Sequence, residues 1–163
     1  MNHATLLIGG NQGDRILLID QATEQIRQRI GSVVALSTVY ETEPWGEFGV
    51  PPQKFLNRGM VVATTLSPWQ VLRTALDIEK KLGRQRPQSS NLNSQVPIRR
   101  YHSRPMDIDL ILYDNLVVDT PELTLPHPRM HLRHFVLEPL AEIMPEFRHP
   151  VLKRTITQLL HEI

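Results

Sequence analysis

The order of strand-like and helix-like segments constrains this chain more than any other feature of its sequence. Apolar and β-branched runs predict four strands, at residues 4–9, 33–42, 54–65 and 106–114. Apolar residues at helical spacing predict one helix at about 14–30, after the first strand, and another at 67–82, after the third. The resulting order, βαββαβ, predicts an α+β fold with a ferredoxin-like core, in which helices pack on an antiparallel sheet.

Residues that start and stop helices stand at both ends of the two predicted helices. Asp14 is expected to cap the start of the first helix, and Gly31 to end it. The second helix has Ser67 as N-cap, Pro68 at its first position and Gly83 just after its end. Both boundaries therefore follow from local sequence.

The C-terminal third of the chain adds further elements to this core. Residues 115–127 suggest a short hairpin, and residues 130–143 and 156–163 suggest two more helices. No internal repeat or second domain is evident, so we expect residues 1–163 to form one domain, with the C-terminal helices as additions.

Composition excludes several functional classes. The 163 residues include no cysteine, which excludes disulfides and thiolate metal ligands. The net charge of +1 argues against a general nucleic-acid binder. The N-terminal apolar run is too short for a signal peptide, and no stretch approaches the ~20 apolar residues of a membrane span. We therefore expect a cytoplasmic protein with neither nucleic-acid nor membrane partners, and we also expect a monomer.

Two acids stand at the start of the fourth predicted strand, in "RPMDIDLIL". Because side chains alternate along a strand, Asp107 and Asp109 should share one face, while Ile108, Leu110 and Leu112 face the other way. Burying two neighbouring carboxylates without a partner is costly. A Mg²⁺ ion, or a pair of them, would remove this cost. The alternative is that Asp107 caps a loop and Asp109 pairs with an arginine.

A basic segment leads directly to this acidic pair. Between Lys80 and Met106 the chain has no acid and carries seven of its 18 Lys and Arg residues. Arginine forks match phosphate oxygens, so the segment suggests an anion site rather than a solvated basic loop. A metal site beside such arginines suggests a polyphosphate ligand. Most of this segment, residues 84–105, is polar and without periodicity, and we expect a lid over the ligand rather than a passive insertion.

Several short motifs follow one another along nearly the whole chain: "IGGN", "YETEPWG", "FLN", "IEKKLGRQR", "RPMDIDLILYD", "LTLPHPRM" and "LRHFVLEPL". Together, in this collinear order, they resemble the 6-hydroxymethyl-7,8-dihydropterin pyrophosphokinase family of folate biosynthesis. The resemblance implies that ATP donates its β,γ-pyrophosphoryl group to the hydroxymethyl oxygen of the pterin, with AMP as leaving group. The chain departs from the family's usual pattern at Gly10, Tyr101, His102, Ser103 and Glu122.

The resemblance also implies roles for individual residues. Asp107 and Asp109 would hold two Mg²⁺ ions and, with Arg84 and Arg104, form the catalytic set. The residues implied to contact ATP are Arg84, Arg86, Arg104, His127 and Arg133. Those implied to contact the pterin are Thr42, Trp45, Phe55, Asn57 and Phe135. In that set Asn57 would bind the amide edge of the ring, and Phe55 and Phe135 would enclose its two faces. No residue is assigned as a general base.

Ordinary structural roles remain open for these residues. Phe55 and Phe135 could be core residues, and Asn57 could cap a turn. His127 could pack within a loop, and Arg133 could be a solvated helix residue. Two other functions also remain open: another two-metal nucleotidyl or phosphoryl transferase on a ferredoxin-like fold, and an RNA-binding module. Neither accounts for "FLN", "TEPWG" and "LPH" together.

Overall fold

The computed structural model describes residues 1–42, 53–82 and 105–163. Its main element is a five-stranded antiparallel sheet in which four strands lie in the order β2-β4-β1-β5 and the short β3 also pairs with β4. The strands are β1 (Asn2–Gly10), β2 (Ser32–Leu36), β3 (Tyr40–Thr42), β4 (Phe55–Thr64) and β5 (Asp107–Tyr113). β5 is therefore an edge strand of the sheet.

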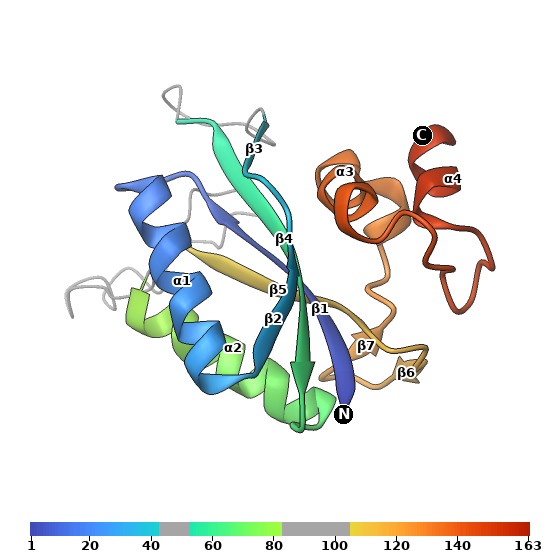
Figure 1. Ribbon diagram of the computed structural model, residues 1–163, viewed down its shortest axis with the longest axis horizontal. Coiled ribbons are helices and arrows are strands. Elements are labelled where there is room, and N and C mark those ends of the chain that lie inside the picture. Colours follow the sequence, from blue (N-terminus) through green and yellow to red (C-terminus); the bar gives the residue numbers. More distant parts are fainter. Residues whose placement is uncertain (43–52, 83–104) are drawn as a thin grey trace.

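Helices cover both faces of this sheet (Figure 1). α1 (Arg15–Arg29) and α2 (Pro68–Leu82) lie side by side on one face, and α3 (His134–Ile143) and α4 (Ile156–His161) lie on the other side. A small hairpin of β6 (Val118–Asp119) and β7 (Thr124–Leu125) follows β5, as predicted for residues 115–127. No helix of the described residues is long and apolar enough to cross a membrane.

The predicted helix starts are confirmed by their capping contacts. The Asp14 side chain accepts a hydrogen bond from the backbone N–H of Leu17 at 3.2 Å. Ser67 Oγ accepts one from the backbone N–H of Gln70, also at 3.2 Å. Each contact satisfies a backbone donor that the first turn of a helix leaves unpaired. Gly83 lies outside the described residues.

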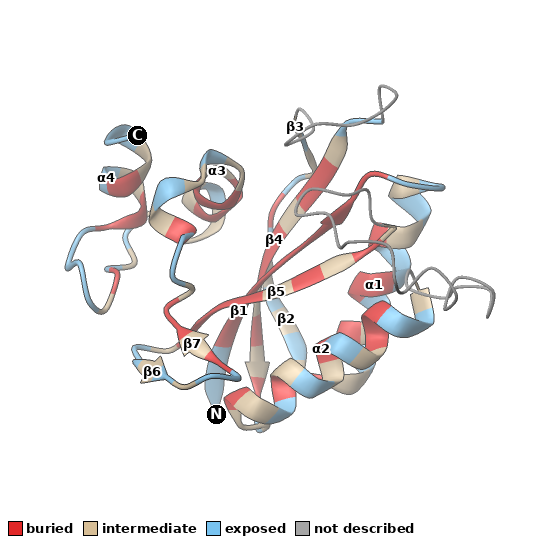
Figure 2. Ribbon diagram, turned by 180° about the vertical axis from the view of Figure 1, so that it is seen from behind, coloured by how far each residue is buried: buried red, intermediate tan, exposed pale blue. Residues whose placement is uncertain are grey.

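Two hydrophobic clusters separate the layers. The larger, between the sheet and α1 and α2, includes Leu6, Ile8, Ile26, Ile78 and Met60, all fully buried. The smaller cluster packs α3 and α4 against the opposite face through residues such as Leu7, Ile111, Leu137 and Leu159. In Figure 2 the buried residues follow β1 and β5 between these layers.

Alternation along β5 fails at one point. Ile108 and Leu110 belong to the α1/α2 cluster as predicted, but Ile111 and Leu112 both belong to the α3/α4 cluster. The pairing register with β1 shifts between Thr5 and Leu6, which indicates a β-bulge that inserts one extra residue into β5. The prediction that Leu112 faces the same way as Ile108 was therefore wrong.

Two predicted elements are divided in the structure. The strand expected at 33–42 becomes β2 and β3, because Ser37 turns its hydroxyl to accept from the backbone N–H of Gly59 at 2.9 Å. The helix expected at 130–143 becomes a 3-10 turn, Met130–Leu132, and α3, because Arg133 has an extended backbone. Local polar bonding and one non-helical residue account for the two breaks.

α3 is fixed to the sheet at two points. A Cβ atom on Gly59 of β4 would lie 3.2 Å from Leu140 and 3.3 Å from Pro139, so the absence of a side chain there allows close packing. The Glu142 carboxylate accepts from the hydroxyls of Thr38 and Tyr40, at 2.9 and 2.8 Å. These bonds lower the pKa of the Glu142 carboxyl, chiefly through the Tyr40 hydroxyl. The C-terminal half of α3 is thereby fixed against β3 and β4.

Candidate active site

One row of paired residues crosses three strands of the sheet on the α3 side. Gly9 of β1 pairs with Asp107 of β5 on one side and with Asn57 of β4 on the other. Directly paired residues of antiparallel strands project from the same face. Two strand spacings, roughly 10 Å, therefore separate the backbones of Asp107 and Asn57. A predicted metal ligand and a predicted pterin contact thus lie on one surface with a glycine between them.

Gly9 cannot carry a side chain in this arrangement. A Cβ atom there would lie 2.5 Å from Asn57 Oδ1 and 2.2 Å from the carbonyl oxygen of Leu56. The buried Asn57 side chain instead lies against the bare backbone of Gly9, and its Nδ2 donates to Thr42 Oγ1 at 3.2 Å. The glycine of "IGGN" therefore makes room for the Asn57 amide.

Asp107 and Asp109 share the half-exposed side of β5, and the intervening Ile108 is buried. This confirms the predicted same-face spacing. Two residues along a strand place their Cα atoms roughly 6–7 Å apart, within reach of a common ligand.

A third carboxylate, Glu79 of α2, lies beside this pair. Its side chain is 3% exposed, and Oε2 accepts a hydrogen bond of 2.6 Å from the backbone N–H of Ile108. Burial raises the pKa of the Glu79 carboxyl to about 7, and the negative charges of Asp107 and Asp109 add to this effect, while the Ile108 N–H opposes it. Negative charge therefore accumulates where β5 begins.

Glu79 was missed from the sequence. It stands in "IEKKLG", where an acid among lysines is typical of an exposed helix face. The signal that could have identified it is its position one residue after Ile78, which belongs to the buried stripe of α2.

His127 and Arg133 lie on the segment that leads from β7 to α3. Burial lowers the pKa of His127, the positive charges of Arg133 and Arg129 lower it further, and the negative charge of Asp107 opposes them. His127 Nδ1 accepts from the backbone N–H of Arg129 at 3.2 Å, so the neutral ring carries its proton on Nε2. The Arg133 guanidinium lies over the Phe135 ring, 5.5 Å from its centroid.

A hollow of about 380 Å³ opens beside the acidic pair. Its wall contains both polar and apolar side chains. The polar ones include Glu79, Asp107, Asp109 and His127. The apolar ones include Leu72, Leu76, Pro121 and Leu123. This combination suits a ligand with a charged end and a flat, less polar end.

Three of the predicted pterin contacts, Thr42, Phe55 and Asn57, gather at the other end of the Gly9 row. Thr42 of β3 pairs directly with Phe55 of β4, and Asn57 lies two residues further along on the same face. Gly59, which packs against α3, lies two residues beyond Asn57 on the same face of β4. Phe55 and Phe135 are both half-buried, and Phe135 packs at the margin of the α3/α4 cluster. Neither phenylalanine is a fully buried core residue.

Four predicted site residues, Trp45, Arg84, Arg86 and Arg104, lie outside the described residues, as does nearly all of the predicted lid, residues 84–105. Within the described ranges, no group of three or more His, Asp or Glu side chains is arranged to hold a metal ion. A cation at Asp107 and Asp109 would therefore need further oxygen ligands from water or substrate.

Curated relatives match most of the chain. A 2-amino-4-hydroxy-6-hydroxymethyldihydropteridine pyrophosphokinase of Porphyromonas gingivalis is 39% identical over 146 residues, which cover 89% of this chain and 92% of the relative. The enzyme of the same name from Bacillus subtilis is 36% identical over 143 residues, covering 87% of this chain and 78% of the relative.

Solved structures share the fold. The wild-type HPPK-DHPS crystal structure from Plasmodium falciparum superposes with a TM-score of 0.72 at 16% identity, and the match covers 99% of this chain but only 44% of that longer chain. A family model described as 7,8-dihydro-6-hydroxymethylpterin-pyrophosphokinase (HPPK) matches residues 5–145. On this match and the similarity to curated relatives, the chain belongs to the HPPK family.

Proposed function

We propose that this protein transfers the β,γ-pyrophosphoryl group of ATP to the hydroxymethyl oxygen of 6-hydroxymethyl-7,8-dihydropterin, with release of AMP, as a step of folate biosynthesis. The observation that carries the proposal is the row Asp107–Gly9–Asn57. It sets a carboxylate site for metal and phosphate beside a buried amide suited to a heterocycle. Membership of the HPPK family supports the same reaction.

ATP would occupy the hollow beside the acidic pair. Its adenine would lie against the apolar wall formed by Leu72, Leu76 and Leu123, and its phosphates would extend toward Asp107 and Asp109. His127 Nε2 is a hydrogen-bond donor at neutral pH in this arrangement. Arg133 supplies positive charge near His127. We assign phosphate contacts also to Arg84, Arg86 and Arg104, on the resemblance alone.

The carboxylates at the start of β5 fit a divalent cation. Three acids lie near one point, and the charges of Asp107 and Asp109 help to raise the Glu79 pKa to about 7, so a divalent cation would reduce the repulsion among them. Asp107 and Asp109 would hold Mg²⁺, and we propose two ions, completed by water and phosphate oxygens. Bound Mg²⁺ would supply positive charge that neutralises the phosphates and makes the β-phosphorus more open to attack by the hydroxymethyl oxygen. Glu79 orients the backbone between the two ligands, and no residue is assigned as a general base.

The pterin would bind at the Asn57 end of the row. A flat ring with a donor–acceptor edge suits an amide and two aromatic faces. Asn57 would pair with the ring edge, Phe55 and Phe135 would enclose its faces, and Thr42 and Trp45 would offer backbone groups. Only strand β1, at Gly9, lies between this site and Asp107. The hydroxymethyl group of the pterin would therefore point toward the phosphates of ATP.

The fold and the cellular setting of the protein are inferred as well. The strand order β2-β4-β1-β5, with α1 and α2 on one face, supports a ferredoxin-like core to which α3 and α4 are additions. We propose that residues 1–163 act as one domain and as a monomer in the cytoplasm, with ATP and the pterin as small-molecule partners.

A product assay tests the function. Purified protein with ATP, Mg²⁺ and the hydroxymethyl pterin should release AMP, one per pterin consumed, and the release should require all three components. ADP as the nucleotide product would indicate an ordinary kinase. Pyrophosphate with a nucleotidylated product would indicate a nucleotidyl transferase.

A further inference from the structure

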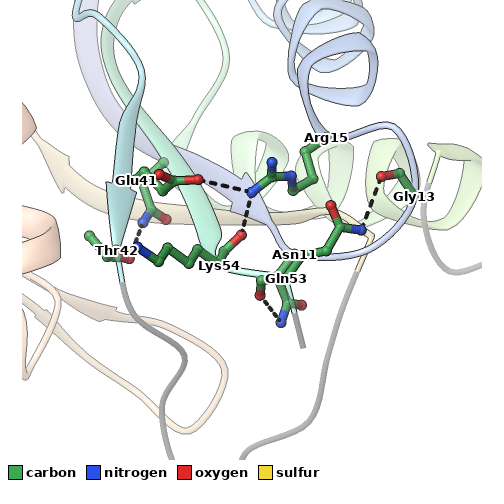
Figure 3. A network of polar contacts seen from close by, with 8 residues as sticks. Asn11, Gly13, Arg15, Glu41, Thr42, Gln53 and Lys54 are labelled. Carbon is green, nitrogen blue, oxygen red and sulfur yellow. Dashed lines mark hydrogen bonds and ion pairs between the residues drawn. The ribbon is translucent and has the colours of Figure 1, made fainter. Parts of the chain in front are cut away.

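Side chains of the turn after β1 bind the residues that lead into β4 (Figure 3). Asn11 Nδ2 donates to the carbonyl oxygen of Gln53 at 3.2 Å, and the Arg15 guanidinium donates to the next carbonyl, of Lys54, at 2.8 Å. Gln53 Nε2 in turn donates to the carbonyl of Gly13 at 3.5 Å. We call these five residues the β1–β4 latch. Asn11 is 1% exposed, so the latch includes a buried amide.

Arg15 also reaches a second strand. The same Nη1 atom lies 3.4 Å from Glu41 Oε2 on β3. One guanidinium therefore holds both the end of β3 and the entry to β4, which flank residues 43–52 in sequence. The Arg15 side chain is 25% exposed and that of Glu41 is 51% exposed, so solvent screens the ion pair, and the 2.8 Å bond to the Lys54 carbonyl is the stronger contact.

The residues held by Arg15 are the immediate neighbours of two proposed pterin contacts. Glu41 precedes Thr42 and Lys54 precedes Phe55, and Thr42 and Phe55 pair directly with each other. Since side chains alternate on a strand, Thr42 and Phe55 face the α3 side whereas Glu41 faces the α1 side. Arg15, at the start of α1, thus supports the pocket from behind the sheet.

We propose that Arg15 is a positioning residue for the pterin site: it fixes the backbone at Glu41 and Lys54 and thereby sets the places of Thr42 and Phe55. The inference rests on the proposed function. Without the Arg15 guanidinium, the end of β3 and the start of β4 lose the group that binds both. Pterin binding must then order these two segments, and this lowers the affinity for the pterin. The ATP hollow lies beside β5 and α2, away from this contact, so ATP binding does not depend on it.

The test compares Arg15→Ala, Arg15→Lys and Arg27→Ala. Arg27 is a matched control, because it is also on α1 and its ion-pair partner, Glu24, is on the same helix. Pterin binding is measured by calorimetry with Mg²⁺ and a non-hydrolysable ATP analogue, and KM for each substrate by AMP release. We expect Arg15→Ala to weaken pterin binding by roughly fivefold or more, the effect of one lost charge-assisted hydrogen bond. Arg15→Lys should recover part of this loss, and Arg27→Ala should have no effect.

The outcomes separate this inference from the proposed function. A selective rise in pterin Kd and KM, with ATP KM and melting temperature unchanged, supports the positioning role. Unchanged pterin binding in Arg15→Ala, or an equal loss for both substrates, overturns it while the function stands if wild-type protein releases AMP. If Arg15→Ala fails to fold, Arg15→Lys decides by the same comparison. Absence of AMP release by the wild type would instead overturn the proposed function.

Discussion

The carboxylate of Glu79 accepts a hydrogen bond of 2.6 Å from the backbone N–H of Ile108, the residue between Asp107 and Asp109. Because β5 is an edge strand, Glu79 serves as the acceptor that a neighbouring strand would otherwise supply. α2 thereby fixes the backbone that carries the two proposed metal ligands. The same contact brings a third carboxylate close to the two aspartates, and the charge of this carboxylate should affect the free energy of unfolding.

Glu79→Gln should change the pH dependence of stability in metal-free protein. The folded-state pKa of about 7 lies above the ordinary 4.5, so ionised Glu79 lowers the free energy of unfolding above pH 7. This cost disappears as the pH falls toward 4.5. Relative to the wild type, the glutamine variant should therefore gain stability as pH rises from 5 to 8, on the order of 1–3 kcal/mol. Urea unfolding in EDTA at several pH values measures this, and parallel curves for the two proteins would contradict it.

Asp107→Asn and Asp109→Asn should each nearly abolish AMP release and leave the fold intact. Each change removes a proposed Mg²⁺ ligand and relieves repulsion in the acidic cluster, so the metal-free melting temperature should stay level or rise. Asp119→Asn is the control, because Asp119 is exposed on β6. Wild-type turnover in either active-site variant at ordinary Mg²⁺ concentrations would show that the carboxylates do not hold the metal.

Phe135→Ala should weaken pterin binding more than ATP binding. Aromatic stacking contributes about 0.5–1.5 kcal/mol beyond area burial, which corresponds to a loss of roughly two- to tenfold. Phe147→Ala is the matched control, since Phe147 packs against the same cluster from beyond α3. If both variants lose stability equally and both keep normal pterin affinity by calorimetry, Phe135 is a packing residue only.

His149 should make stability fall under mildly acidic conditions. Burial lowers its pKa from 6.5, the positive charge of His131 lowers it further, and its Nδ1 accepts from the backbone N–H groups of Val151 and Leu152. The unfolded chain therefore binds a proton more readily, and the contribution of neutral His149 is lost as pH falls below about 6.5.

His149→Asn tests this, since an amide oxygen can accept the same bonds without titrating there. The variant should lose less stability than the wild type between pH 7.5 and 5.5. His127 also has a lowered pKa and Glu79 acts in the opposite direction, so the difference between the two proteins is the quantity to compare. An identical change in both would exclude His149 as the source.

The sequence predicted those parts of the fold that depend on interactions between residues close together in the chain. The caps at Asp14 and Ser67 and the shared face of Asp107 and Asp109 follow from bonding and periodicity within a few residues. The bulge that turns Leu112 toward α3 depends on pairing with β1, so alternation alone gave the wrong face.

The site itself is assembled by long-range contacts that no single segment specifies. Gly9, Asn57 and Asp107 become neighbours through strand register, and Glu79 becomes buried through the packing of α2 against β5. Motif resemblance named Asn57 and Asp107, but the row through Gly9 required the structure. Glu79 was missed because charge is typical of an exposed helix position.

The position of the transferred phosphorus atoms tests the central claim most directly. With ATP labelled at the β-phosphate, wild-type protein, Mg²⁺ and the hydroxymethyl pterin, the account predicts that all transferred label appears on the pterin and that the released AMP is unlabelled. Label recovered in ADP, or in free pyrophosphate with AMP joined to the pterin, would contradict pyrophosphoryl transfer at this site.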